Sequence, residues 1–161
     1  VLDPDEAARL LLQAEREIRK GLAITPGLGL GLGALAGIDS REMRYRECLE
    51  KTRQAIASAH TDPQVLTYAS NFLPWFGTLA EAEHNAEQLL SLDPLNSASW
   101  ISRSQTFLAS GRFEQAAEAA RKGLELAPEN HSAMNMVALV LAAMGRYDEA
   151  VAAIGNYAPL K

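Results

Sequence analysis

The landmarks of this sequence recur at a fixed interval of 34 residues. The turn Gly111-Arg112-Phe113 returns as Gly145-Arg146-Tyr147, and Pro94 returns as Pro128. A period of this length is typical of arrays in which short helical units stack and each contacts only its neighbours. The chain is also rich in alanine and poor in aromatic residues (6%), which favours closely packed helices over sheet. The period therefore predicts an all-α fold.

Aligned at this interval, most positions of the repeat keep one kind of residue. One position is always small, as two helices need when they approach closely, and another, three residues earlier, is always large. The small position holds Ala14, Cys48, Ala82, Ala116 and Ala150. The large position holds Leu11, Tyr45, Leu79, Phe113 and Tyr147.

Glycine and proline mark the turns. We expect one position to adopt the left-handed conformation between two helices, and it holds Met43, Gly77, Gly111 and Gly145. Another position should end a helix, and it holds Pro26, His60, Pro94 and Pro128. These marks predict one array over residues 1–161: a half repeat 1–28, full repeats 29–62, 63–96 and 97–130, and an incomplete terminal repeat 131–161. Pro74 should kink or end the first helix of the 63–96 repeat.

Together, Trp100, the Gly111-Arg112-Phe113 turn, Ala116, Ala120 and Pro128 resemble the tetratricopeptide repeat (TPR). The resemblance covers nearly the whole chain. It is weakest in residues 29–62, where Asp39 replaces a large apolar residue, Met43 replaces the turn glycine and His60 replaces proline. It implies a right-handed αα-superhelix without catalytic residues, whose first helices line a concave groove for peptides or partner helices. The Leu92–Asn96 junction also resembles TPR regions of larger bacterial signalling regulators, such as cyclase and winged-helix activator families.

In this register, the resemblance implies that a set of uncharged side chains lines the partner-binding groove. The set comprises Tyr68, Asn71, Trp75, Ile101, Gln105, Leu108, Asn135, Met136 and Leu139. Chaperone-binding members of the family hold a terminal carboxylate with cationic side chains, and without such donors carboxylate capture loses its strong hydrogen bonds. The groove chemistry suits an amphipathic helix or an extended apolar peptide. The alternative is that these side chains cover one another in a tightly wound array.

Gly29, Gly33 and Gly37 form a stripe on the first helix of the 29–62 repeat. One interpretation is that the stripe lets another backbone approach closely. The other is that the glycines only weaken the helix, at about 1 kcal/mol each relative to alanine.

The terminal repeat leaves an apolar surface near its end. Residues 133–144 are apolar on nearly every side, and such a helix needs cover on more than one side. We expect either a neighbouring domain of a longer protein or a second copy at this end, and a two-fold homodimer is a reasonable prediction. The residues expected to take part are Val140, Met144, Val151 and Ile154.

Several other functions are disfavoured. The net charge of −5 and the lack of a basic excess argue against nucleic-acid binding. The uncharged run 21–38 holds six glycines and a proline, which argues against membrane insertion. No metal-ligand spacing or nucleophile–base motif is visible, so we expect no metal, no cofactor and no enzyme activity.

Cys48 stands at the small position and is expected to be a packing residue. A lone cysteine does not indicate in which cellular compartment the protein lies, although we favour the cytoplasm. The chain begins at Val1 without a signal peptide, and we expect it to be a piece of a longer protein. The sequence thus predicts a non-enzymatic protein–protein interaction module. The alternatives are a structural dimerisation or spacer array, and an accessory domain of a larger regulator or enzyme.

Overall fold

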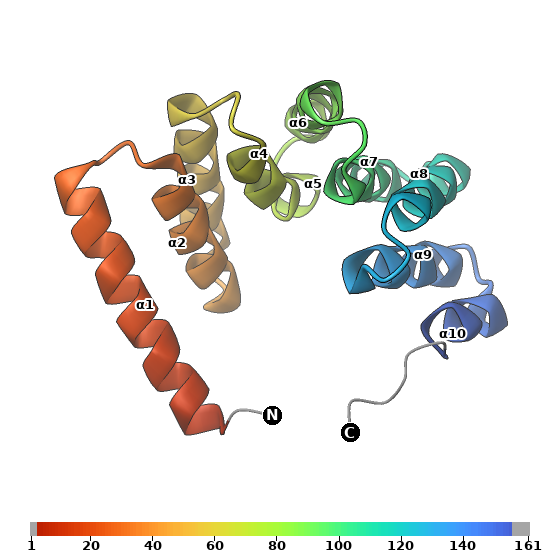
Figure 1. Ribbon diagram of the computed structural model, residues 1–161, viewed down its shortest axis with the longest axis horizontal. Helices are drawn as coiled ribbons and strands as arrows, with labels where there is room; N and C mark the ends of the chain where they lie inside the picture. Colours follow the sequence, from red (N-terminus) through yellow and green to blue (C-terminus); the bar gives the residue numbers. More distant parts are fainter. Residues whose placement is uncertain (1–2, 156–161) are drawn as a thin grey trace. The chain divides into compact units, whose positions relative to one another are not determined.

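In the computed structural model, residues 3–155 are described, and they form ten α-helices and no β-strand (Figure 1). The all-α prediction is confirmed. The chain divides into two compact units, the first ending at Phe72 and the second beginning at Leu73. The helices are α1 (Pro4–Ile24), α2 (Gly29–Arg41), α3 (Tyr45–Ser58), α4 (Pro63–Ser70), α5 (Leu73–Phe76), α6 (Leu79–Leu92), α7 (Ser97–Ala109), α8 (Phe113–Leu126), α9 (His131–Ala143) and α10 (Tyr147–Gly155).

The first unit contains α1 to α4. Helices α2 and α3 form a hairpin, α4 packs on both of them, and α1 packs on α2. The core holds Leu32, Ala55 and Val65, with Leu22 of α1 packed against its edge. Burial of these apolar side chains provides the main driving force for the packing.

The second unit contains α5 to α10. Its two hairpins, α7–α8 and α9–α10, stack so that α9 covers both α7 and α8, while α5 and α6 pack on α7. Small residues of α8 meet larger residues of α9 in the main core, which holds Ala116, Ala117, Ala120, Met136 and Val140. A smaller core joins Ala138 and Leu141 of α9 to Ala150 of α10.

The small position of the repeat is buried in four of its five occurrences. Cys48 and Ala116 are fully buried, Ala82 is 2% exposed and Ala150 is 7% exposed. Helices approach closely there, since the Ser104 hydroxyl of α7 donates a hydrogen bond of 2.8 Å to the carbonyl oxygen of Ala116. Ala14 differs and is exposed. Burial raises the pKa of the Cys48 thiol, as expected of a packing residue.

Three of the four expected turns take the left-handed conformation. The φ angles are +58° at Met43, +74° at Gly111 and +76° at Gly145. At each turn the next residue's N–H donates to a carbonyl five residues back: Arg44 to Asp39 at 2.8 Å, Arg112 to Phe107 at 2.9 Å and Arg146 to Leu141 at 2.9 Å. This bond is the signature of a Schellman motif. Met43 therefore adopts the glycine conformation with a side chain, which is unfavourable for an L-residue.

Gly77 does not follow the prediction, because its φ is not positive. It is needed for a close approach instead: an added Cβ would lie 2.9 Å from the carbonyl oxygen of Leu73. Helix α5 is only four residues long, and α6 begins at once behind a capping box of Thr78 and Glu81. No room remains for the longer turn of the other repeats.

The expected break at Pro74 is confirmed. Helix α4 ends at Ser70, Asn71 is its C-cap, and the short helix α5 begins at Leu73. Proline has no N–H to donate to the carbonyl of Ser70, so α4 cannot continue through this position. The boundary between the two compact units falls in the same stretch.

The glycine stripe lies inside the first unit. An added Cβ at Gly29 would lie 2.9 Å from the Cβ of Ala59, and one at Gly33 would lie 3.2 Å from the Cβ of Tyr68. At Gly37 the nearest atom, in Phe72, would be 3.9 Å away. The stripe thus lets the chain's own α4 approach α2, and α2 remains a continuous helix.

Candidate partner-binding surface

Most of the predicted groove residues belong to the second unit. Trp75 lies on α5 and is 48% exposed, and Leu139 lies on α9 and is 49% exposed. Ile101 and Leu108 of α7 are half-buried, and both pack against the main core. Asn135 is exposed on α9. Each offers apolar or amide surface from a helix of the second unit.

Met136 lies elsewhere. It is only 4% exposed and belongs to the main core. It is adjacent to Asn135 on the helix and therefore points about a quarter turn away, toward α8. In this structure its side chain fills the interior of the second unit.

Two polar atoms of α7 are buried without a partner. The hydroxyl oxygen of Ser102 and the amide oxygen of Gln105 have no hydrogen-bond partner among the described residues. Unsatisfied buried polar atoms are unfavourable, typically by about 1–3 kcal/mol each. A donor supplied nearby would stabilise both.

Two cations close to α7 are engaged within the second unit. The guanidinium groups of Arg103 and Arg112 lie 4.7 and 4.6 Å from the centre of the Phe107 ring. Arg103 also pairs with Glu87 at 3.6 Å, and Arg112 pairs with Glu83. The predicted groove residues themselves carry no charge.

Tyr68 and Asn71 belong to the first unit. Tyr68 is 42% exposed, and its Cβ lies near Gly33 of α2. Asn71 is exposed at the end of α4, where its backbone N–H donates to the carbonyl of Tyr68 at 3.1 Å. The α2–α4 contact therefore holds Tyr68, while the exposed Asn71 ends α4.

A cavity of about 500 Å³ lies between α9 and α10. It brings together two predicted groove residues, Asn135 and Leu139, and two predicted self-association residues, Val151 and Ile154. The other two expected self-association residues lie elsewhere: Val140 is fully buried, and Met144 packs against the main core. The remaining lining residues are Ala138, Ala142, Tyr147 and Ala150.

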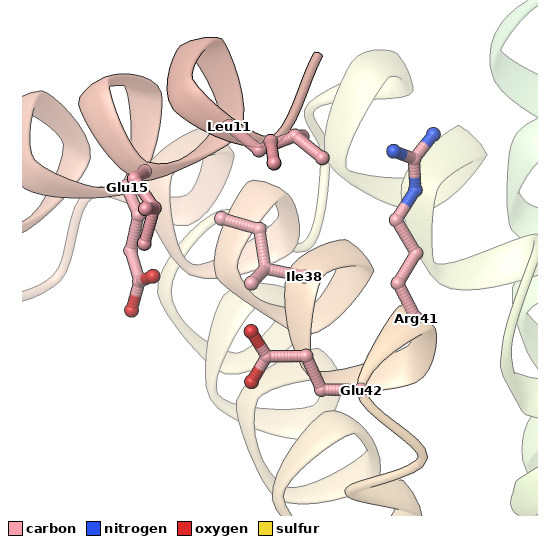
Figure 2. Close-up of a pocket in the computed structure, with 7 residues that line it drawn as sticks. Leu11, Glu15, Ile38, Arg41 and Glu42 are labelled. Carbon is pink, nitrogen blue, oxygen red and sulfur yellow. The ribbon is translucent and has the colours of Figure 1, made fainter. Parts of the chain in front are cut away.

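A second cavity, of about 300 Å³, lies between α1 and α2 in the first unit. Figure 2 shows Leu11 and Ile38 facing each other across it, and Arg41 lies beside them at its edge. Glu15 and Glu42 also line it. The sequence predicts Leu11 only as a packing residue, because a pattern shared by all repeats does not reveal that α1 packs on α2 alone among the described helices of the first unit.

Comparisons with known proteins give the family. The family model described as tetratricopeptide repeat matches residues 77–130 and 101–159. The chain belongs to the tetratricopeptide repeat family. No curated protein matches the sequence.

Solved structures show the same fold. A crystal structure of MamA matches with a TM-score of 0.63 and 16% identity over 96% of this chain and 92% of that one. A thermophilic TPR protein of Thermus thermophilus, TTC0263, matches with a TM-score of 0.68 and 20% identity over 79% and 71%. The first TPR of Spaghetti (RPAP3), bound to the HSP90 peptide SRMEEVD, matches with a TM-score of 0.59 and 19% identity over 73% and 94%.

TPR domains are scaffolds that are generally non-catalytic, and the matches indicate no enzyme family. Within the described part of the chain, no helix is long and apolar enough to cross a membrane. Across the same residues, no group of three His, Cys, Asp or Glu side chains could hold a metal ion.

The first TPR hairpin, α2–α3, departs most from the family pattern. Asp39, at a position where a large apolar residue is expected, is 2% exposed. Its carboxylate accepts hydrogen bonds of 2.6 Å from Arg44 and 2.5 Å from Lys51. Burial alone would raise the pKa of Asp39, but these hydrogen bonds outweigh it and hold the pKa below the ordinary 3.8. The cluster therefore joins α2, the turn and α3 as an ion-paired core.

Proposed function

We propose that this TPR chain is an interaction module that binds an apolar or amphipathic segment of a partner protein. The binding surface would be formed in the second unit by Trp75 of α5, Ile101, Gln105 and Leu108 of α7, and Asn135 and Leu139 of α9. The observation that carries the proposal is that these side chains are all at least partly accessible and uncharged. Exposed aromatic and aliphatic side chains on rigid helices are the usual anchors of such interfaces.

Two polar atoms buried beneath this surface support a ligand held in one register. The buried amide oxygen of Gln105 and the hydroxyl of Ser102 lack partners among the residues that the structure describes. An N–H or hydroxyl donor of a bound segment could satisfy them after a small rearrangement of α7. Such a bond would favour one position of the ligand over others shifted along the surface.

The ligand class should differ from that of Spaghetti (RPAP3). The peptide bound there, SRMEEVD, is rich in carboxylates, and carboxylates bind best to cationic donors. Arg103 and Arg112, two cations near α7, are already paired with Glu87 and Glu83. This chain is therefore better suited to an uncharged apolar face.

A double variant, Trp75→Ala/Leu108→Ala, tests the proposal. Partners captured by the parent chain should be lost or strongly weakened, while circular dichroism remains that of the folded parent. Glu114→Ala/Glu118→Ala, on the exposed side of α8, is the matched control and should retain them. A folded Trp75→Ala/Leu108→Ala variant that keeps every partner of the parent would disprove the binding surface.

A further inference from the structure

The cavity between α9 and α10 is equivalent, one repeat later, to the surface of the α7–α8 hairpin that α9 covers. In the α7–α8 hairpin, Ala116, Ala117 and Ala120 of α8 pack under Met136 and Val140 of α9. Moved by 34 residues, these alanines become Ala150, Val151 and Ile154, and all three line the α9–α10 cavity. Among the described residues no further helix covers them, and Val151 is 70% exposed.

The side chains of this surface differ from those of its covered counterpart. Where α8 has the small residues Ala117 and Ala120, α10 has Val151 and Ile154, which protrude. With Tyr147 they form an apolar ridge along α10 at spacings of four and three residues, which places them on one helix face. On α9, Ala142 stands where α7 has Leu108, so the neighbouring side of the cavity is hollow. Ridge and hollow therefore lie in one patch.

A patch that carries both a ridge and the hollow beside it is self-complementary. Two copies related by a two-fold axis can each place the ridge in the other's hollow, as an isologous contact requires. None of the eight lining residues is charged, so no like charges meet across the axis. The nearby Arg146 is already paired with Glu149 at 2.6 Å.

We propose that the α9–α10 surface, lined by Leu139, Tyr147, Val151 and Ile154, is a self-association site that takes a second copy of this chain. Pairing would also cover Leu139 and Asn135, which belong to the proposed partner-binding surface. Self-association would then compete with partner binding at α9 and leave Trp75 and Leu108 free. This proposal does not depend on partner binding, because its test needs no partner.

Sedimentation velocity over a range of protein concentrations tests the proposal directly. The parent chain should shift from monomer to dimer as its concentration rises. Val151→Glu should weaken this association by about a hundredfold or more, because two carboxylates would meet in an apolar contact. Ala152→Glu, the exposed neighbour outside the cavity lining, should leave it unchanged. Both variants should keep the parent's circular dichroism, since the substituted side chains are exposed.

Three outcomes would overturn the proposal. One is a chain that stays monomeric at every concentration. A second is a dimer that Val151→Glu does not weaken, and a third is a series of ever larger species, which would indicate a head-to-tail contact.

Discussion

The α2–α3 hairpin of the first unit and the α7–α8 hairpin of the second follow the same backbone course with different side chains. Arg44 and Arg112 occupy equivalent positions after their turns, and both act on the residue five places earlier. Arg44 donates hydrogen bonds to the buried carboxylate of Asp39. Arg112 instead lies 4.6 Å from the centre of the Phe107 ring. The Schellman turn thus fixes the repeat, while the core beside it can be ionic or apolar.

The largest expected effect comes from making the first hairpin resemble the second. Asp39→Leu should lower the free energy of unfolding by about 1–3 kcal/mol, because Lys51 loses its hydrogen-bonded carboxylate, while Arg44 loses Asp39 and keeps its ion pair with Glu42. Asp39→Leu/Lys51→Leu should recover most of that loss, since an apolar pair can replace a buried ion pair. Urea unfolding followed by circular dichroism measures both. A single variant as stable as the parent would contradict the ionic core.

Acid should destabilise the α2–α3 hairpin, which has the ionic core, more than the α7–α8 hairpin. The pKa of Asp39 in the folded chain lies below its ordinary value of 3.8. Its ion pairs therefore contribute stability that is fully present above about pH 4 and is lost as pH falls through the folded pKa. The protection factors of the amides in α2 and α3, which correct exchange rates for their intrinsic pH dependence, should fall with acid more steeply in the parent than in Asp39→Leu/Lys51→Leu. If protection depended on pH equally in the parent and the double variant, Asp39 would not be the source of the acid sensitivity.

The left-handed turn residues of the two hairpins, Met43 and Gly111, should give opposite and smaller changes in stability. Met43→Gly should stabilise the chain by about 1 kcal/mol, because Met43 holds a left-handed φ and its side chain is 75% exposed. Gly111→Ala should destabilise it by a similar amount. An added Cβ at Gly111 meets no atom within 4 Å, so the effect would come from the backbone alone. Thermal unfolding of both variants checks the opposite signs, and a shared sign would be inconsistent with equivalent turns.

The glycine stripe gives the smallest expected effects. Gly37→Ala should stabilise α2 by roughly 0.5–1 kcal/mol through helix propensity, since its new Cβ meets Phe72 only at 3.9 Å. Gly29→Ala should destabilise the first unit, because its Cβ would lie 2.9 Å from that of Ala59. Amide exchange in α2 measures both, with Gly37→Ala as the matched control. A stabilising Gly29→Ala would show that the close approach at this glycine is unimportant.

The repeat, the helices and the break at Pro74 could be predicted from the sequence alone. Periodicity and the missing proline N–H are properties of a short stretch of chain and need no knowledge of its tertiary contacts. The ionic core was not predictable in the same way. Asp39 appeared only as a departure from the pattern, and its partner Lys51 lies on the next helix. The sequence predicts Met136 and Val140 at surfaces, but both are buried against α8. Their burial depends on how α9 sits on the α7–α8 hairpin, which a pattern shared by all repeats does not specify.

The central claim is that the uncharged surface of the second unit binds an apolar helical face. The two tryptophans of this unit provide the most direct measurement, because Trp75 is 48% exposed, whereas the Trp100 indole donates to the carbonyl of Pro94 at 2.8 Å. The chain labelled with nitrogen-15 would be titrated with an amphipathic peptide that has leucines on one helical face and balanced glutamates and lysines on the other. The indole signal of Trp75 should move and saturate while that of Trp100 stays in place, and a scrambled peptide should move neither. A Trp75 signal that does not move, or that moves equally with the scrambled peptide, would contradict the claim.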